Sequence, residues 1–242
     1  MQAGKITPIA NDAEMRAFAV KRIGEEYVSE FDANLMKLKV ALRRGVVADA
    51  CFLFNSMRPV ASEKDSPMQQ MAKREHFAHF VAPTSTLSFL AACTIAKALP
   101  PDAEVLEVNA LHGLQGRMLQ LARCRVQMIH RAATAPDHPI CEVHMVGSPV
   151  SYLEGSGTRF EALLLAVTSY RGGEEDALRC VEVFKGSIII YIGHHVDHRN
   201  RREARIITLL KRDFEIANTI GAPQGRFLIP AHQVCIFKRR NK

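Results

Sequence analysis

Ser187-Ile188-Ile189-Ile190-Tyr191-Ile192 is the stretch of this 242-residue chain that most clearly predicts a β-strand. The residues after Ser187 are β-branched or aromatic and present apolar groups to both faces, which is typical of a strand buried in the middle of a sheet. Gly193 ends the strand. A second long apolar run, residues 160–170, predicts another central strand, with a buried helix as the alternative.

Local signals in the first hundred residues predict helices. Asn11 can cap a helix that begins at Asp12, because its side chain can accept a hydrogen bond from the first turn. Ser66-Pro67-Met68-Gln69 matches a capping box with proline at the first helical position. Residues 25–44 begin with acidic side chains and end with arginines, and Gly45 follows as a stop. Helices are therefore predicted from residue 12 and at 25–44, 67–81 and 85–99, and segment 46–54 is a strand or a buried turn of helix.

From about residue 103 the pattern changes toward the alternation of strands. Strands are predicted at 104–110, 140–146 and 227–238, a loop at 172–176 and a late helix at 200–219. The last strand is placed at an edge or at a bulge, because Pro230 has no backbone N–H to donate. Residues 117–129 fit a strand or a helix, and the neighbouring strands favour a strand.

The order of these elements predicts an α+β fold. It consists of a helical N-terminal part followed by a mixed, mainly antiparallel sheet with one late amphipathic basic helix. The boundary falls near residue 100, so residues 1–100 form the helical part and residues 101–242 form the sheet-rich part with the basic C-terminal helix and tail. One continuous domain is the alternative, because 242 residues suit one large domain or two small ones.

Positive charge is concentrated at the C-terminal end of the chain. Residues 199–242 contain 11 Lys or Arg against 3 Asp or Glu, a net charge of +8, whereas residues 1–198 carry a net charge of −1. A basic face of this kind indicates an anionic partner, such as nucleic acid, a phosphorylated ligand or an acidic protein. The alternative is a solvated helix and tail that only keep the protein in solution.

A helical wheel places the basic and the apolar residues of the late helix on separate arcs. Guanidinium groups on the basic arc can meet successive phosphates, and the tail adds a cationic arm. The predicted nucleic-acid or anion-binding residues are His198, Arg201, Arg205, Arg212, Lys238, Arg239 and Arg240. Since aromatic residues make up only 7% of the chain and tryptophan is absent, contacts to a nucleic-acid backbone are expected rather than base stacking.

Three imidazoles and one carboxylate directly follow the central strand. His194, His195, Asp197 and His198 are candidate ligands of a metal such as zinc, because loops at sheet ends often hold sites. Their spacing matches no metal motif with a stated mechanism. They support an alternative hypothesis, a metal-dependent hydrolase.

The sequence lacks the familiar glycine-rich nucleotide-binding loops and the G-x-S-x-G nucleophile motif. Its six cysteines are widely spaced without C-x-x-C, which is typical of reduced thiols in an intracellular protein. The first residues lack an apolar signal segment, and the longest apolar runs are far shorter than the ~20 residues of a membrane helix. No stretch matches a family signature.

These observations favour a non-enzymatic protein of a reducing compartment such as the cytoplasm. We expect it to bind nucleic acid, RNA before DNA, or another polyanion within a larger assembly, with an acidic protein as the alternative partner. An oligomer is compatible with the sequence, and no membrane span is expected. No cofactor is expected, apart from a divalent metal such as zinc under the hydrolase hypothesis.

Overall fold

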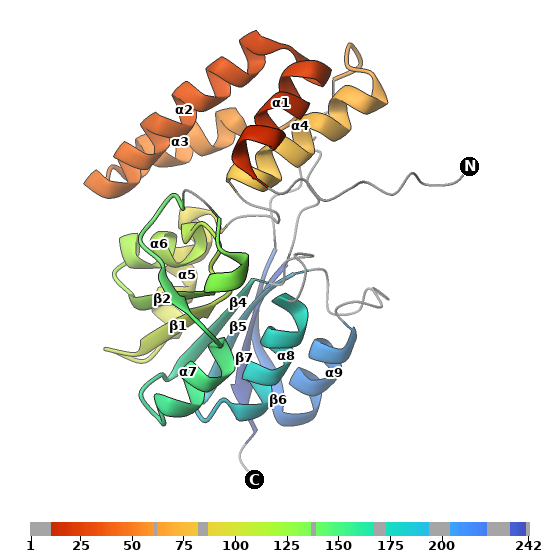
Figure 1. Ribbon diagram of the computed structural model, residues 1–242. Coiled ribbons are helices and arrows are strands. Elements are labelled where there is room, and N and C mark those ends of the chain that lie inside the picture. The colour runs from red at the N-terminus through yellow and green to blue at the C-terminus, as the bar shows by residue number, and fades with distance from the viewer. Residues whose placement is uncertain are drawn as a thin grey trace.

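The computed structural model describes residues 11–60, 62–81, 87–136, 139–166, 173–193, 204–221 and 233–240. A layer of N-terminal helices stands over a twisted sheet that carries further helices on its two faces (Figure 1). Within the described ranges, no helix is long and apolar enough to cross a membrane.

The sheet has seven strands in the order β3-β2-β1-β4-β5-β7-β6. The strands are β1 Glu104–Val108, β2 Arg125–Arg131, β3 His144–Val146, β4 Ala162–Ala166, β5 Ile188–Gly193, β6 Phe214–Ile220 and β7 Gln233–Arg239. The pairings among β1 to β5 are all parallel. β7 lies between β5 and β6 and pairs antiparallel with both.

The helices form two groups. The N-terminal layer contains α1 Asp12–Ile23, α2 Glu25–Arg44, α3 Val47–Met57 and α4 Pro67–Phe80. The sheet is accompanied by α5 Phe89–Ala98, α6 Leu114–Leu121, α7 Pro149–Gly155, α8 Gly173–Val183 and α9 Ala204–Asp213, with a short 3-10 helix at Ala132–Thr134.

The predicted helix signals are confirmed. The side chain of Asn11 accepts a hydrogen bond from the backbone N–H of Glu14. Ser66 and Gln69 form the capping box at the start of α4. Gly45 follows α2 in the left-handed conformation. Segment 46–54, for which a strand and a helix were both open, belongs mostly to helix α3.

The predicted α+β fold with a mainly antiparallel sheet is wrong. The chain forms a doubly wound α/β sheet, in which parallel neighbours are joined by helices: α6 lies between β1 and β2, and α8 lies between β4 and β5. Parallel strands need such a crossover, whereas antiparallel strands can be joined by a tight turn. Alternation within one strand does not reveal the direction of its neighbour, so the strand pattern alone left the pairing undetermined.

Two apolar clusters fill the two faces of the sheet. Successive side chains of a strand point to opposite faces. Leu164 and Ile190 belong to the cluster that contains residues of α5, α6 and the N-terminal layer. Leu163 and Tyr191 belong to the cluster that contains residues of α7, α8 and α9. β5 is buried along its whole length, which confirms the prediction of a central strand.

Several element boundaries differ from the predictions, and three of them divide or change an element. Residues 117–129 are divided between α6, which ends at Leu121, and β2. The predicted loop at 172–176 gives way to α8, which begins at Gly173. The late helix ends at Asp213, and the residues that follow form β6. In each case the local pattern fits two structures and packing against the sheet selects one of them. The last strand, β7, lies between β5 and β6, so the expectation of an edge position is wrong. Pro230, on which that expectation rested, lies outside the described residues.

Replacement of Ile190 by alanine tests the position of the central strand. Ile190 is fully buried and faces Leu164 and Ile236 on the two neighbouring strands. Ile190→Ala should lower the free energy of unfolding by about 2–5 kcal/mol, because it leaves a cavity in a packed core. Ile216 on the edge strand β6 is 43% exposed, so Ile216→Ala should cost about 0.5 kcal/mol or less. Urea unfolding followed by circular dichroism measures both, and equal losses would contradict this placement.

Candidate functional site

The candidate site lies at the carboxyl edge of the sheet, where β1 and β4 are neighbours. From this pair the strand order runs outward in two directions, through β2 to β3 and through β5 to β6. The helices that follow β1 and β4 pack on opposite faces, because α6 contributes to one apolar cluster and α8 to the other. Ligands of doubly wound sheets bind outside the carboxyl ends of the strands at such a point. The N-terminal layer stands over this edge (Figure 1).

The turn Asn109-Ala110-Leu111-His112-Gly113 connects β1 to α6, and we call it the β1 turn. Its backbone enters the left-handed region three times, with φ of 58° at Asn109, 52° at Leu111 and 73° at Gly113. Glycine adopts this conformation freely and asparagine tolerates it. For other residues it costs about 1–2 kcal/mol. Leu111 therefore holds a strained conformation that its surroundings must maintain.

Backbone donors of the β1 turn are used within the protein. The N–H of Leu111 donates to Nδ1 of His130 at 3.2 Å. The N–H of Ala110 donates to the carbonyl oxygen of Ile129 at 3.0 Å, and that of Gly113 to the carbonyl oxygen of Ala110 at 2.8 Å. The first two bonds fasten the turn to the end of β2, and the third lies within the turn.

Close packing requires glycine at two positions near the start of α6. A Cβ atom on Gly113 would lie 2.8 Å from Cγ2 of Val143. On Gly116 it would lie 2.5 Å from Oε2 of Glu107 and 2.6 Å from Cγ of Met128. The first turn of α6 can therefore approach β1 and β2 more closely than any side chain would allow.

Glu107 is a buried carboxyl group on β1, with an exposed fraction of 1%. Its Oε2 accepts a hydrogen bond from the N–H of Gly116 at 2.8 Å. Its Oε1 has no hydrogen-bond partner within the described part of the chain. Burial raises the pKa of Glu107 to about 8, against the opposing effect of the Gly116 N–H. The group is therefore protonated and neutral near pH 7.

His112 joins the β1 turn to the N-terminal layer. Its Nε2 lies 2.7 Å from the carbonyl oxygen of His79 on α4, so Nε2 carries the hydrogen and Nδ1 is an acceptor. Nδ1 is buried and has no hydrogen-bond partner among the described residues. Burial lowers the pKa of His112 to about 4, so the ring is neutral near pH 7. Nε2 of His79 in turn lies 2.8 Å from Oδ1 of Asp12 on α1.

The end of β2 presents an imidazole and a guanidinium group. His130 is buried and accepts the hydrogen bond from the β1 turn. Nε of Arg131 donates to Oδ2 of Asp176 on α8 at 2.9 Å. In dinucleotide-binding sheets a carboxylate about 20 residues after the glycine-rich turn binds the ribose hydroxyls. Here the corresponding place is taken by His130 and Arg131.

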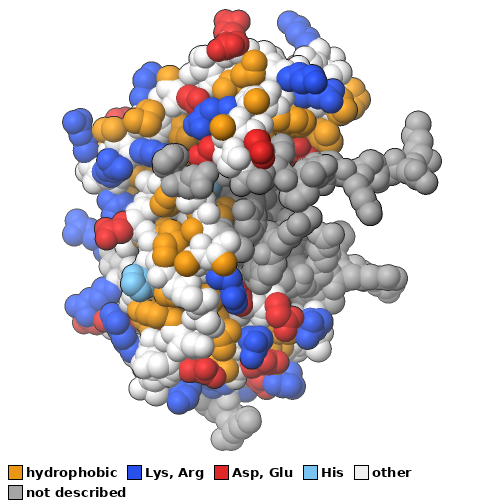
Figure 2. Space-filling model, in the orientation of Figure 1, with side chains coloured by type: hydrophobic (Ala, Val, Ile, Leu, Met, Phe, Trp, Pro, Cys, Tyr) orange, Lys and Arg blue, Asp and Glu red, His pale blue; other side chains and the backbone are white. Residues whose placement is uncertain are grey.

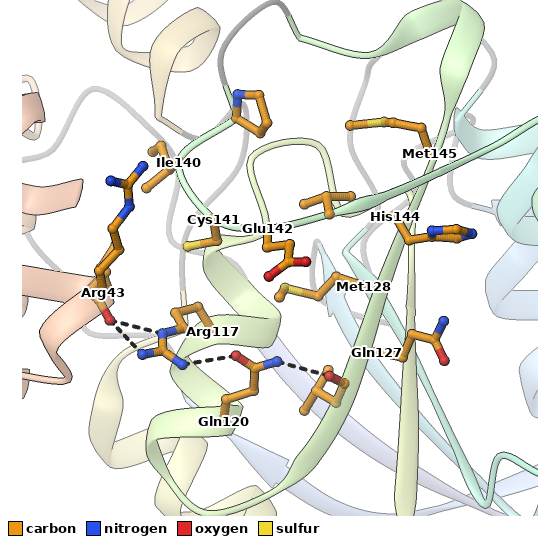
Figure 3. Close-up of a pocket in the computed structure, with 14 residues that line it drawn as sticks. Arg43, Arg117, Gln120, Gln127, Met128, Ile140, Cys141, Glu142, His144 and Met145 are labelled. Atoms are coloured by element: carbon orange, nitrogen blue, oxygen red, sulfur yellow. Dashed lines mark hydrogen bonds between the residues drawn. The ribbon is translucent and has the colours of Figure 1, made fainter. Parts of the chain in front are cut away.

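A separate groove of about 960 Å³ lies beside β2 (Figure 3). It is lined by β2, α6, the C-terminal end of α2 and segment 139–145. Arg117 donates two hydrogen bonds, of 3.0 and 2.6 Å, to the carbonyl oxygen of Leu42 and so joins α6 to α2. Met128 and Val143 line the groove and also pack around the β1 turn. Within the described part of the chain, the residues that line the groove include none from β1, β4 or the β1 turn, so the groove is separate from the carboxyl ends of β1 and β4.

Several residues singled out from the sequence lie outside the described residues. They are His194, His195, Asp197, His198 and Arg201. Their roles stay predictions. Within the described ranges, no group of three or more His, Cys, Asp or Glu side chains could hold a metal ion.

The remaining basic residues form contacts within the protein or reach solvent. Arg205 pairs with Glu175 at 3.3 Å, and Arg212 pairs with Asp213 at 2.7 Å. Lys238 is exposed. On the face shown in Figure 2, basic and acidic side chains are interspersed over the lower half of the molecule.

Arg239 and Arg240 bind carbonyl groups of the protein. Arg239 donates to the carbonyl oxygens of Gly186 and Phe184 at 3.1 and 2.7 Å, and its guanidinium lies 4.5 Å from the ring centroid of Phe214. Arg240 donates to the carbonyl oxygen of Phe214 at 3.2 Å. The two arginines thus hold the end of β7 in place, and their role in anion binding stays a prediction.

No family model and no curated protein matches the chain. Among solved structures, it is similar to Burkholderia thailandensis 1,6-didemethyltoxoflavin-N1-methyltransferase with bound S-adenosylhomocysteine, at a TM-score of 0.48 and 17% identity over 76% of this chain and 94% of that one. It is similar to Geobacter metallireducens precorrin-6y C5,15-methyltransferase at a TM-score of 0.43 and 10% identity, over 65% and 94% of the two chains. A third similar structure is the mitomycin 7-O-methyltransferase MmcR, at a TM-score of 0.42 and 11% identity, over 96% and 74%.

These findings correct three expectations. The structures found are methyltransferases, which contradicts the expected non-enzymatic nucleic-acid-binding protein of a larger assembly and also the alternative of a metal-dependent hydrolase. S-adenosylhomocysteine is present in the Burkholderia structure, which contradicts the expectation of no cofactor. The charge imbalance is a poor guide to an anionic partner, because Arg239 and Arg240 at the basic C-terminal end bind carbonyl groups of the protein itself.

The β1 turn does not match a glycine-rich loop pattern, because Asn109 and Leu111 occupy two of its three left-handed positions. The sequence pattern therefore did not identify it. Two signals were present in the sequence. Glu107 is a single carboxyl group between apolar residues of a strand, and Gly113 and Gly116 follow it at a spacing of three.

Replacement of Glu107 by glutamine tests the buried carboxyl group. The folded protein raises the pKa of Glu107 from 4.5 to about 8, so the folded state binds more protons than the unfolded state between these values. The wild type should therefore lose stability as the pH rises from about 4.5 to about 8, by at most about 1.4 kcal/mol per pH unit for one proton. Glu107→Gln keeps an acceptor for Gly116 and removes this loss.

The measurement is the free energy of unfolding of both proteins between about pH 5 and about pH 9. His112 has a lowered pKa and gives the opposite dependence, because its contribution is lost as the pH falls below about 6.5. Since both proteins contain His112, its effect cancels in the difference. The free energy of unfolding of Glu107→Gln should increase relative to that of the wild type as the pH rises. If the two curves of this free energy against pH are parallel, Glu107 is ionised in the folded protein.

Proposed function

We propose that this protein is a methyltransferase that binds S-adenosylmethionine at the carboxyl edge of its sheet. The observation that carries the proposal is the point between β1 and β4 where the strand order runs outward in both directions and where the β1 turn leads into α6. Doubly wound sheets bind nucleotide-type ligands there. Among such ligands we choose S-adenosylmethionine, because the similar structures are named as methyltransferases.

The chemistry of the edge suits a ligand that has both acceptor and donor groups. The amino end of an α-helix carries a partial positive charge and can meet a carboxylate, and α6 begins directly after the β1 turn. Oε1 of Glu107 and Nδ1 of His112 are buried polar atoms near this end that lack a hydrogen-bond partner among the described residues. Buried polar atoms are normally paired, so two unpaired ones beside one turn support a ligand site.

The position of the N-terminal layer favours a small molecule as the methyl acceptor. The layer contacts the β1 turn through the bond between His112 and the carbonyl oxygen of His79 on α4. The segment between α4 and α5 adds a contact to α6, because Oε1 of Gln115 accepts a hydrogen bond from the N–H of Leu87 at 2.7 Å. Arg117 extends the contact to Leu42. A cover fixed in this way would limit the access of water and of bulky partners to the edge, which favours a small acceptor. S-adenosylmethionine supplies a methyl group on a sulfonium centre, and this chain supplies binding, orientation and exclusion of water.

Isothermal titration with S-adenosylhomocysteine tests the proposal. The wild type should bind one equivalent saturably, and at about 100 times Kd the ligand should stabilise the protein by about 2.7 kcal/mol. Ala166 ends β4 beside the β1 turn and is half-buried, so Ala166→Phe should fill the edge and abolish binding.

Ala217 provides the matched control, because it is exposed on the edge strand β6. Ala217→Phe makes the same change in size and should leave binding intact. Equal binding by both variants would place the ligand elsewhere. Absence of binding by the wild type in millimolar ligand would overturn the proposal.

A further inference from the structure

We infer that the β1 turn limits the affinity for S-adenosylmethionine in two ways. The side chain of Leu111 narrows the cofactor site, and the hydrogen bond from Leu111 to His130 uses a backbone donor of the turn. The inference rests on the proposed function, since it concerns the same edge of the sheet. It assigns Leu111 and His130 as the residues that determine how tightly this chain holds the cofactor.

The conformation of Leu111 is the first observation. Its φ of 52° is one that glycine adopts freely and that a branched side chain rarely adopts. Left-handed backbone in a turn between a strand and a helix lets the chain pass close to a ligand when the residue is glycine. Leucine keeps this path of the backbone and adds a side chain of four carbon atoms to the turn.

The burial of Leu111 is the second observation. The residue is only 6% exposed, yet in the described part of the chain it belongs to neither of the two apolar clusters that fill the faces of the sheet. Val108 just before the turn and Leu114 just after it belong to one cluster each. Leu111 is therefore buried at the edge between the layers, which is where the ligand is proposed to bind.

The hydrogen bonds of the turn are the third observation. A turn of this kind binds an anionic group through N–H groups that point at the ligand. Here the N–H of Leu111 donates to Nδ1 of His130, and the N–H groups of Ala110 and Gly113 donate to carbonyl oxygens. These donors are already used, and the imidazole that accepts one of them stands where a carboxylate would bind the ribose hydroxyls.

The test compares S-adenosylhomocysteine binding by the wild type, Leu111→Gly and Leu111→Gly/His130→Asp. Leu111→Gly should lower the Kd by about tenfold or more, because it removes the side chain that obstructs the site. The double variant introduces a carboxylate at the end of β2 and should bind S-adenosylhomocysteine more tightly than Leu111→Gly does. Leu111→Ala, which keeps only the Cβ atom, should fall between the wild type and Leu111→Gly, and it serves if the glycine variant does not fold.

Arg123→Gly is the matched control. Arg123 is exposed and has a φ of 73°, so glycine relieves the same backbone strain at a place outside the β1 turn. Its affinity should equal that of the wild type. A gain in this variant equal to that in Leu111→Gly would show that relief of strain raises affinity wherever it occurs, and would overturn the inference.

The remaining outcomes separate the inference from the proposed function. If the wild type binds and the Leu111 variants bind no tighter, the inference fails and the function stands. If the wild type does not bind and the double variant does, the inference stands and the wild type is not an S-adenosylmethionine-dependent enzyme. If no protein binds although all are folded by circular dichroism, both fail.

Discussion

Burial of the central strands on both faces is the constraint on which the rest of this structure depends. β4 and β5 carry apolar side chains in both directions, so neither face of the sheet can meet water. Helices must cover both faces, and helical crossovers make the neighbouring strands parallel. Parallel strands end at one common edge. The position of the candidate site at the β1 turn is therefore a consequence of the way in which the core is buried.

The reversed strand β7 completes the sheet and explains part of the basic C-terminal end. β7 enters between β5 and β6 in the opposite direction, which brings its final residues to the amino edge of the sheet. The carbonyl groups of Phe184, Gly186 and Phe214 lie there, and Arg239 and Arg240 bind them. The two arginines thus donate hydrogen bonds to backbone carbonyl groups at the edge where β7 ends.

Local structure could be predicted from the sequence because its causes are local. The caps at Asn11 and Ser66 depend on residues within one helical turn, and both form as expected. Strand direction depends on what lies between strands. The glycine and acidic residues at 172–176 predict a loop, whereas 173–176 form the start of α8. The β1 turn escaped for a different reason. A left-handed Leu111 contradicts local preference, and the hydrogen bond that supports it, from the N–H of Leu111 to Nδ1 of His130, joins residues 19 positions apart.

The electrostatics of the edge follow from the same burial. Glu107 and His112 are neutral near pH 7 because desolvation moves the pKa of the acid up to about 8 and that of the base down to about 4. Two titratable groups therefore stand beside the β1 turn without adding net charge. A zwitterionic ligand would meet hydrogen-bonding atoms and the amino end of α6 rather than an ion pair. Such a site selects by shape and by hydrogen-bond direction, which makes the volume taken by one side chain, that of Leu111, decisive for affinity.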